Sequence, residues 1–252
     1  MKILFHGICG RIGQETLRIT REGYRDAEIV CGVDFHATEG GELPCYTSFD
    51  RIDRAFDVDC IIDFSHHTAI GPLLKYATAN RLPVIVATTG HTEEELALID
   101  EAAKVIPVFR SGNMSLGISL LIELAKTTAA NMPDANIEIV ETHHNRKLDA
   151  PSDTALMIAD AIRTVRRTAN YVLGRAGQGK RTDDEIGIHA IRMGNVVGTH
   201  EVIIGTDSQT ITLKHEAHSR ALFAEGALAA AAYLCGKPAG MYNMQSMIAE
   251  QG

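Results

Sequence analysis

The sequence contains no tryptophan, and its five cysteines are scattered along the chain. They form no C-x-x-C pair and no spacing typical of metal ligands, which predicts reduced thiols in a cytoplasmic protein and no metal site. No apolar run approaches the roughly 18 residues that cross a membrane, and the short run at the N-terminus ends in glycines, unlike a signal peptide. These absences predict a soluble, cytoplasmic protein with no membrane partner.

The chain also lacks an excess of positive charge. The formal net charge is -8, and an acidic chain has nothing to offset phosphate repulsion over a broad face, so no nucleic-acid partner is expected. An anionic small molecule would need a local cationic patch. The 252 residues, with 45% hydrophobic content, suffice for one large domain or two modest ones with real cores.

Short apolar runs alternate with helical patterns from residue 2 to residue 110. This alternation predicts βαβ units and a Rossmann-type parallel sheet with helices on both faces. The continuous rather than alternating apolar character of the strands supports burial on both sides. The predicted strands are 2–6, 27–34, 59–64, 82–89 and 106–110, and the predicted helices are 10–22, 68–80 and 93–105.

The pattern changes after residue 114. A helix is predicted over 116–131, a strand over 136–144, a helix over 154–165 and a mobile loop over 174–185. Three further strands, 186–192, 196–205 and 210–217, are joined by hairpin-length turns, which predicts antiparallel or mixed pairing. An Ala-rich helix over 220–236 is expected to return to the first domain. The whole is predicted to be an α/β protein with a dinucleotide-binding domain (1–114 and 220–252) and a second α/β domain with a mixed open sheet (115–219).

The segment "GICGRIG" lies between the first strand and the first helix, with glycines at Gly7, Gly10 and Gly13. Glycines let a backbone approach a pyrophosphate, and the start of the helix offers unpaired N–H groups. Asp34 ends the second strand, where an acid binds the adenosine ribose. These features favour dinucleotide binding over a tight turn without a ligand. The carboxylate would repel a 2′-phosphate and favours NADH, while Arg11 leaves NADPH open.

The segment "VATTGHT" ends another predicted parallel strand. Ligands of such sheets lie beyond the carboxyl ends of the strands, so Ala87, Thr88 and Thr89 are expected on the nicotinamide side. Thr92 is alternatively a simple helix N-cap that forms a capping box with Glu95, and the two interpretations are compatible.

The densest cationic stretch is "ETHHNRKLDAPSDTA", residues 141–155. His143 and His144 are neighbours on a strand and point to opposite faces, which disfavours a shared zinc ion. One packed and one solvated histidine is the alternative without function. Lys147 adds a cation, and the helix predicted to start near Pro151 offers free N–H groups to a carboxylate. A proton donor beside an anion site fits a dehydrogenase that takes hydride from its other domain.

This stretch resembles E-x-H-H-x-x-K-x-D-A-P-S-G-T-A, the signature of the dihydrodipicolinate (4-hydroxy-tetrahydrodipicolinate) reductase family of lysine and diaminopimelate biosynthesis. Further segments follow the family's order over nearly the whole chain, among them "IIDFSHH", "SGNMSLGI", "HEAHSRALFAEGA" and "KPAGMYNM". The resemblance implies NAD(P)H-dependent reduction of the cyclic dicarboxylate (2S,4S)-4-hydroxy-2,3,4,5-tetrahydrodipicolinate. It also implies a homotetramer built through the sheet of the second domain.

The resemblance also implies roles for individual residues. His143 would donate and accept a proton with Lys147 as a proton donor beside it. The implied substrate-binding residues are His144, Asp153 and Thr154. The implied cofactor-binding residues are Gly7, Ile8, Cys9, Gly10, Arg11, Ile12, Asp34, Ala87, Thr88, Thr89, Ser111, Gly112, Asn113, Met114 and Arg220.

Asp153 departs from the family pattern, which has glycine at this position. If the substrate binds to the backbone N–H, the side chain is expected to turn away and act as a helix cap. If the side chain instead faces the pocket, its charge opposes the substrate carboxylate and admits a different ligand. Two other functions therefore stay open: a related Rossmann dehydrogenase for another amino or imino acid, and a non-catalytic NADH-binding regulator. A regulator would not need His143 and Lys147, which argues against it.

Overall fold

The chain folds into two compact units around two separate sheets. The computed structural model describes residues 1–38 and 41–251. The first unit comprises Met1–Ser115 and Arg220–Gly252, and the second unit comprises Leu116–Ser219. The predicted fold class is confirmed, since a parallel sheet with helices occurs together with a second, mixed sheet.

A seven-stranded parallel sheet forms the centre of the first unit, in the order β12-β6-β5-β4-β1-β2-β3. Strand order reverses between β1 and β4, and in open parallel sheets such a switch point opens a crevice for ligands beyond the carboxyl ends. The strands are β1 (Lys2–His6), β2 (Glu28–Val33), β3 (Cys45–Tyr46), β4 (Cys60–Asp63), β5 (Val84–Val86), β6 (Pro107–Arg110) and β12 (Gly240–Tyr242).

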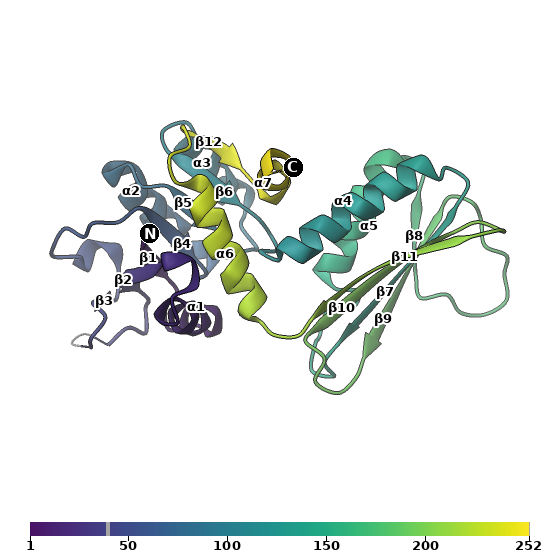
Figure 1. Ribbon diagram of the computed structural model, residues 1–252, viewed down its shortest axis with the longest axis horizontal. Coiled ribbons are helices and arrows are strands. Elements are labelled where there is room, and N and C mark those ends of the chain that lie inside the picture. Colours follow the sequence, from purple (N-terminus) through teal and green to yellow (C-terminus); the bar gives the residue numbers. More distant parts are fainter. Residues whose placement is uncertain (39–40, 252) are drawn as a thin grey trace. The chain divides into compact units, whose positions relative to one another are not determined.

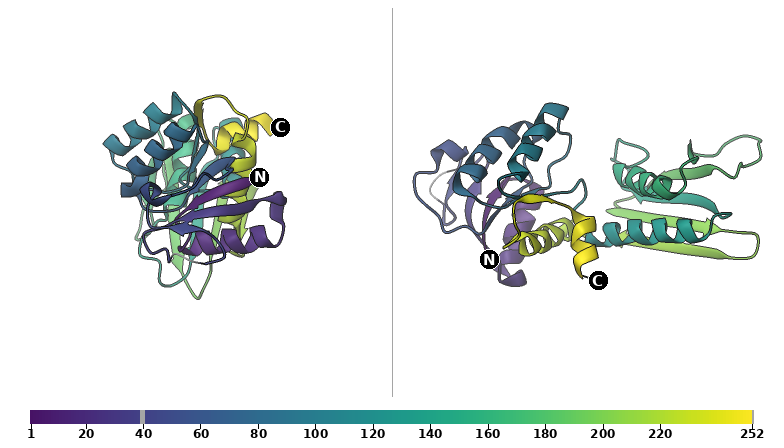
Figure 2. Two further views of the ribbon diagram at one scale, coloured as in Figure 1. Left: turned by 90° about the vertical axis from the view of Figure 1, so that its left-hand side faces the viewer. Right: turned by 90° about the horizontal axis from the view of Figure 1, so that it is seen from above.

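Helices cover both faces of this sheet (Figure 2). Helix α1 packs against α6, and α2 lies beside α3 (Figure 1). The strands are apolar on both sides because both faces are buried: Leu4 and Ile61 belong to the same core cluster as Leu73 of α2. The helices are α1 (Arg11–Arg21), α2 (Ile70–Asn80), α3 (Glu93–Ala103), α6 (Ala221–Leu234) and α7 (Met244–Gln251), with short 3-10 turns at Tyr24–Asp26, Phe49–Arg51 and His67–Ala69.

The second unit has a five-stranded mixed sheet in the order β11-β10-β7-β9-β8. The central strand β7 is parallel to β9 and antiparallel to β10. Two long helices pack side by side on one face. The elements are α4 (Leu116–Asn131), β7 (Asn136–His143), α5 (Asp153–Val165), β8 (Asn170–Leu173), β9 (Glu185–Arg192), β10 (Gly198–Gly205) and β11 (Thr210–Ala217).

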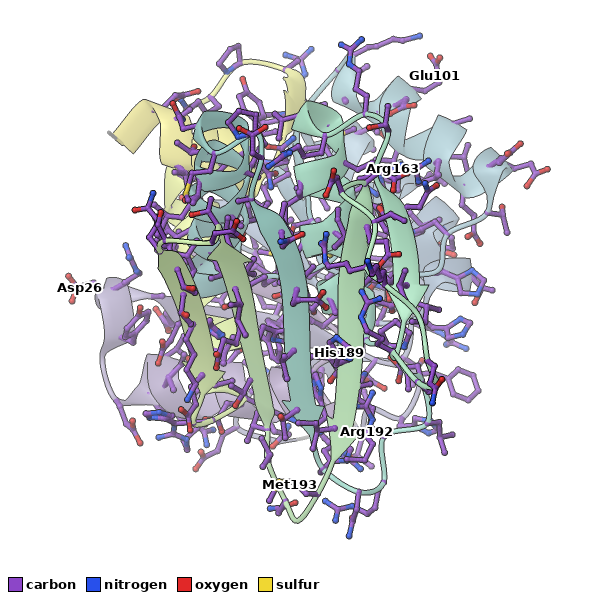
Figure 3. All side chains as sticks on the ribbon, turned by 90° about the vertical axis from the view of Figure 1, so that its right-hand side faces the viewer. Asp26, Glu101, Arg163, His189, Arg192 and Met193 are labelled. Carbon is purple, nitrogen blue, oxygen red and sulfur yellow. The ribbon has the colours of Figure 1, made fainter. Side chains whose placement is uncertain are left out.

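Side-chain alternation on β7 separates the two faces of this sheet. Ile137 and Ile139 are buried under α4 and α5, together with Ile188 and Val202 from the neighbouring strands. The opposite face carries polar and half-buried side chains, and Figure 3 shows it with His189 on β9. One covered and one open face is the usual arrangement for a sheet with antiparallel pairs.

The structure corrects the predicted connections of this sheet. The turn at Gly194–Asn195 is not a hairpin, because β9 and β10 are separated by β7. Residues 193–197 therefore cross one strand, a span of about 10 Å. The turn at Asp207–Ser208 does join the antiparallel pair β10 and β11. Strands β3, β8 and β12 and helix α7 were not predicted.

Gly226 in α6 provides a test of the packing in the first unit. A Cβ atom at this position would lie 1.7 Å from the backbone oxygen of Met114. We expect Gly226→Ala to lower the free energy of unfolding by about 3 kcal/mol, because helix and backbone must separate. Gly71→Ala in α2 is the matched control: its Cβ meets nothing within 4 Å, so helix propensity should raise stability by up to about 1 kcal/mol. Urea unfolding of both variants would show this, and equal effects would contradict it.

Candidate functional site

The turn between β1 and α1 needs glycine for steric reasons. Gly7 has a φ of +88°, and a Cβ there would lie 2.5 Å from the backbone oxygen of Phe64. Gly10 is the N-cap of α1 and brings no side chain to the start of the helix. The first N–H groups of α1 therefore stay accessible to an anion, and the helix dipole favours negative charge there.

Asp34 fixes this turn to the end of β2. One carboxylate oxygen accepts a hydrogen bond from the Cys9 N–H (2.9 Å) and the other from the His36 N–H (2.9 Å). A cavity of about 750 Å³ opens beside the carboxylate, a size typical of ligand sites. Phe35 borders the same cavity, although 84% of its surface is exposed. The cavity lining is His6, Gly7, Cys9, Gly10, Asp34, Phe35, His36, Phe64, Ser65, His66, Thr68 and Ala69.

Ala87, Thr88 and Thr89 line a second cavity of about 330 Å³ at the end of β5. Residues 64–66 border both cavities, so the two adjoin beyond the carboxyl ends of β4 and β5. The buried Asp63 carboxylate accepts hydrogen bonds from the Thr88 hydroxyl (2.7 Å) and the Ser65 hydroxyl (2.6 Å). The expected capping box of Thr92 and Glu95 is present at the start of α3.

The loop after β6 also reaches this edge of the sheet. The Ser111 N–H donates to the backbone oxygen of Val86, and the Ser111 hydroxyl donates to the backbone oxygen of Asn113 (2.7 Å). Met114 is buried, and Gly112 lies between these anchored residues. The predicted segment Ser111–Met114 therefore lies beside the end of β5.

Eight predicted cofactor residues do not line either cavity: the four of the segment Ser111–Met114, and Ile8, Arg11, Ile12 and Arg220. The Ile8 side chain is buried, and a Cβ at Gly32 would lie 2.9 Å from it. Arg11 and Ile12 open α1, Arg11 being exposed. Arg220 is the exposed N-cap residue of α6. The remaining glycine-turn residues and Asp34 are brought together.

In the second unit, His143 ends β7 and contacts a buried carboxylate. Its Nδ1 atom lies 2.6 Å from Oε2 of Glu141, which is fully buried. Arg192 donates to both carboxylate oxygens (2.8 Å each), and the Ser152 N–H donates to Oε1 (3.1 Å). Burial favours a higher pKa for Glu141, but the hydrogen bonds from His143 and Arg192 prevail and lower the pKa to about 2.

Lys147 lies in the loop that follows β7. Its Nζ atom pairs with Asp149 at 2.7 Å, and this hydrogen bond lowers the pKa of Asp149. The guanidinium of Arg192 also donates to the backbone oxygen of Asp149 (2.6 Å), and Asn145 N–H donates to Gly194 oxygen. The loop is therefore held by the turn that follows β9. His144 is half-buried.

The start of α5 differs from the expectation for Asp153. The N-cap is Ser152, whose hydroxyl accepts a hydrogen bond from the Ala155 N–H (3.2 Å). Asp153 is the first helical residue and its side chain is exposed, so it is not the cap. Thr154 is half-buried beside it. Pro151 precedes the cap instead of opening the helix.

His200 of β10, the strand next to β7, completes this cluster. It is paired in register with Glu141, its Nε2 lies 3.2 Å from the Ser152 hydroxyl, and its ring centre is 5.2 Å from that of His143. Burial, reinforced by repulsion from His143, lowers the pKa of His200 to about 3. His200 is therefore neutral at physiological pH.

Glu141, Arg192 and His200 were not predicted as site residues. Glu141 lies two positions before His143, and residues two apart on a strand point to the same face. The sequence therefore could have indicated that Glu141 lies beside His143. Arg192 and His200 come from other strands, and their approach depends on strand pairing that no local pattern reveals.

Within the described ranges, no group of three or more His, Cys, Asp and Glu residues could hold a metal ion. No described helix combines the length and apolarity that crossing a bilayer requires.

These features define a class. A glycine turn and an acid at the switch point of a parallel sheet, joined to a second α/β unit with a histidine and a lysine, characterise two-unit oxidoreductases of the Rossmann type. The family domain "Dihydrodipicolinate reductase, N-terminus" matches residues 1–114, and "Dihydrodipicolinate reductase, C-terminus" matches residues 117–248. The chain belongs to the dihydrodipicolinate reductase family, which confirms the resemblance.

Related sequences match this chain over almost its full length. The 4-hydroxy-tetrahydrodipicolinate reductase of Clostridium tetani is 42% identical over 98% of this chain and 97% of its own length. The enzyme of the same name from Caldanaerobacter subterraneus subsp. tengcongensis is 45% identical, covering 98% of both chains.

Solved structures support the fold. Dipicolinate-bound dihydrodipicolinate reductase from Paenisporosarcina sp. TG-14 superimposes with a TM-score of 0.82 at 22% identity, over 96% of this chain and 97% of that chain. A myo-inositol dehydrogenase from Corynebacterium glutamicum gives a TM-score of 0.61 at 15% identity, over 99% and 92%.

The neutral state of His200 predicts acid sensitivity. Unfolded histidine has a pKa of about 6.5, whereas folded His200 has a pKa of about 3. The unfolded state therefore binds a proton in this interval that the folded state does not. Below pH 6.5 the free energy of unfolding should fall by about 1.4 kcal/mol per pH unit from this group alone. His200→Gln should remove this component, and urea unfolding of both proteins between pH 6 and pH 4 measures it. If the free energy of unfolding depended on pH equally in both proteins, the prediction would be contradicted.

Proposed function

We propose that the chain reduces (2S,4S)-4-hydroxy-2,3,4,5-tetrahydrodipicolinate to tetrahydrodipicolinate in the diaminopimelate route to lysine. The reaction consumes NAD(P)H and a proton and releases NAD(P)+ and water. The observation that carries this proposal is the cluster of His143, Lys147 and the start of α5 in a chain whose other unit has a dinucleotide-type cavity. The names of the full-length relatives support the same reaction.

The first unit (1–114 with 220–252) is proposed to hold the cofactor, which supplies hydride when bound. The turn fits a pyrophosphate because Gly10, the N-cap of α1, brings no side chain to the first N–H groups of the helix. Asp34 keeps its carboxylate at the cavity, where two N–H groups hold it in place. A fixed negative charge there repels a 2′-phosphate, which favours NADH over NADPH. Ala87–Thr89 and Ser111–Met114 are proposed for the nicotinamide side.

The second unit (115–219) is proposed to bind the dicarboxylate and to manage protons. Substrate carboxylate oxygens would accept hydrogen bonds from the N–H groups at residues 153 and 154 and from His144. Lys147 would exchange its Asp149 partner for the substrate anion and donate a proton. Because Nδ1 of His143 is taken by Glu141, Nε2 is left to give a proton to the substrate.

The catalytic assignment predicts the behaviour of a double variant. We expect His143→Ala with Lys147→Ala to lower kcat by at least 10³-fold, since general acid catalysis typically contributes 10²–10⁴-fold. The dissociation constant for NADH, measured by fluorescence titration, should stay within about twofold because both residues belong to the second unit. Turnover is followed as NADH and NADPH oxidation with substrate generated in place.

Unchanged turnover in that double variant would reject the assignment. Cofactor binding by the unmodified protein without any substrate-dependent oxidation would favour a regulator instead. Turnover of another imino acid in preference to the dicarboxylate would move the reaction to a related dehydrogenase.

Asp153 provides a test of how the substrate is held. Its side chain is exposed in the first turn of α5, where water screens it from a ligand bound to the backbone. Asp153→Asn should therefore change KM for the dicarboxylate by less than about threefold and should lower stability by about 0.3–1 kcal/mol through the lost helix-dipole interaction. A tenfold fall in KM would show that the carboxylate faces the substrate.

A homotetramer is proposed through the open face of the second sheet (Figure 3). Ile191 of β9, which pairs with Thr142 on the open face, is an exposed large apolar residue, and contact with another copy would remove its area from water. We place the enzyme in the cytoplasm, in keeping with its five free cysteines.

A further inference from the structure

Glu141 is the fully buried anion at the centre of the second unit's polar cluster. A carboxylate without solvent needs donors, because an unpaired buried charge is costly. It receives them from three directions: His143 on its own strand, Arg192 on β9, and the Ser152 N–H before α5. Arg192 binds with both terminal nitrogens, a geometry that adds direction as well as strength.

Arg192 fixes the charge state of Glu141 beside His143. Two charge-assisted hydrogen bonds of 2.8 Å stabilise the ionised carboxylate, so Glu141 stays charged throughout the working pH range. An ionised carboxylate can only accept a hydrogen bond. In the 2.6 Å contact between Glu141 and Nδ1 of His143, the hydrogen therefore belongs to the imidazole.

His200 limits the repulsion that a charged His143 would meet. The Ser152 hydroxyl accepts a hydrogen bond from the Ala155 N–H and lies 3.2 Å from Nε2 of His200. Burial keeps His200 neutral, as its lowered pKa shows. Two further ionisable groups lie near the two rings: Lys147, which is paired with Asp149, and His215 of β11, which is paired in register with His200 on β10. The pKa of His215 is also lowered by burial.

The backbone leaves space for the opposite edge of the His143 ring. A Cβ at Gly198 would lie 3.1 Å from Nε2 of His143, so the ring occupies room that glycine provides. Nδ1 is held by Glu141, whereas no carboxylate among residues 1–38 and 41–251 pairs with Nε2. The two nitrogens are thus chemically distinct.

We propose that Glu141 is a positioning residue that holds His143 in the Nδ1–H tautomer and stabilises its protonated form, so that Nε2 exchanges the proton with the substrate. In the neutral ring, Nδ1–H donates to Glu141 and Nε2 carries the lone pair. After protonation from solvent, Nε2–H transfers its proton to the substrate and the ring returns to the Nδ1–H tautomer. The link to catalysis rests on the proposed function, whereas the tautomer and the titration do not.

The test is an NMR titration of His143 in the ligand-free protein. In Glu141→Gln the amide retains the shape but lacks the charge, so the midpoint of His143 should fall by about one to three pH units. The alkaline limb of the kcat/KM–pH profile, which reports the free enzyme, should move to lower pH by a similar amount, because the acid form is lost earlier. A Glu141 with only a structural role would change stability and leave the midpoint where it was.

Glu138→Gln is the matched control on the same strand. Glu138 points to the open face, where it contacts Nε2 of His189 (2.8 Å) and Arg181, and Figure 3 shows His189 there. This variant should shift the midpoint of His189 and leave that of His143 unchanged. An unchanged His143 midpoint in folded Glu141→Gln would overturn the proposal.

If Glu141→Gln does not fold, a measurement on the unmodified protein tests the proposal independently. Ring nitrogen shifts of neutral His143 should identify the Nδ1–H tautomer, and an Nε2–H tautomer would overturn the proposal. If the titration moves as expected while His143→Ala remains fully active, the positioning role stands and the proposed catalytic function fails.

Discussion

A buried carboxylate must find hydrogen-bond donors, and in each unit this requirement organises the candidate site. Asp63 at the end of β4 is almost fully buried and receives the hydroxyls of Ser65 and Thr88, which joins the ends of β4 and β5 beside the cavities. Glu141 near the end of β7 receives His143, Arg192 and the N–H before α5. Each acid thus ties together loops that are distant in sequence. Removing Arg192, the charged partner of Glu141, would break a buried ion pair at a cost of about 3–5 kcal/mol, so the segments that Glu141 joins cannot move independently.

The first unit was largely predictable because its information is local. Continuous apolar runs marked β1, β2 and β4, and the glycines of "GICGRIG" marked the turn into α1, where steric contact with Phe64 requires them. The short strands β3 and β12 have two and three residues, too few for any periodicity, and they exist because a neighbouring strand offers its free edge. In the second unit, the turn length suggested a hairpin between β9 and β10, yet the buried strand β7 takes the place between them. Burial of the apolar residues of β7 at the centre of the sheet stabilises the fold more than a hairpin at the short turn would.

The candidate site divides in the same way. His143 and Lys147 follow from residue types within one short segment, and alternation adds Glu141 to the face of His143. Arg192 lies 51 residues from Glu141 and His200 lies 48 residues from Ser152, so their approach required the strand order itself. The cap at the start of α5 illustrates a closer competition: Ser152 and Asp153 are both good caps, and the hydroxyl prevailed because the N–H of Ser152 is fixed by Glu141.

The two cations of the second unit differ in how firmly they are held, and this difference suits them to different tasks. Lys147 pairs with the half-exposed Asp149, and a pair of this kind contributes only about 0–1 kcal/mol, so exchanging Asp149 for a substrate carboxylate is inexpensive. Arg192 pairs with a carboxylate that water does not reach, and separating them would leave a buried charge. An acidic chain can therefore present a cation to a dianion without carrying it unpaired. Lys147 is the movable charge, and Arg192 is the fixed one that keeps Glu141, and through it His143, in place.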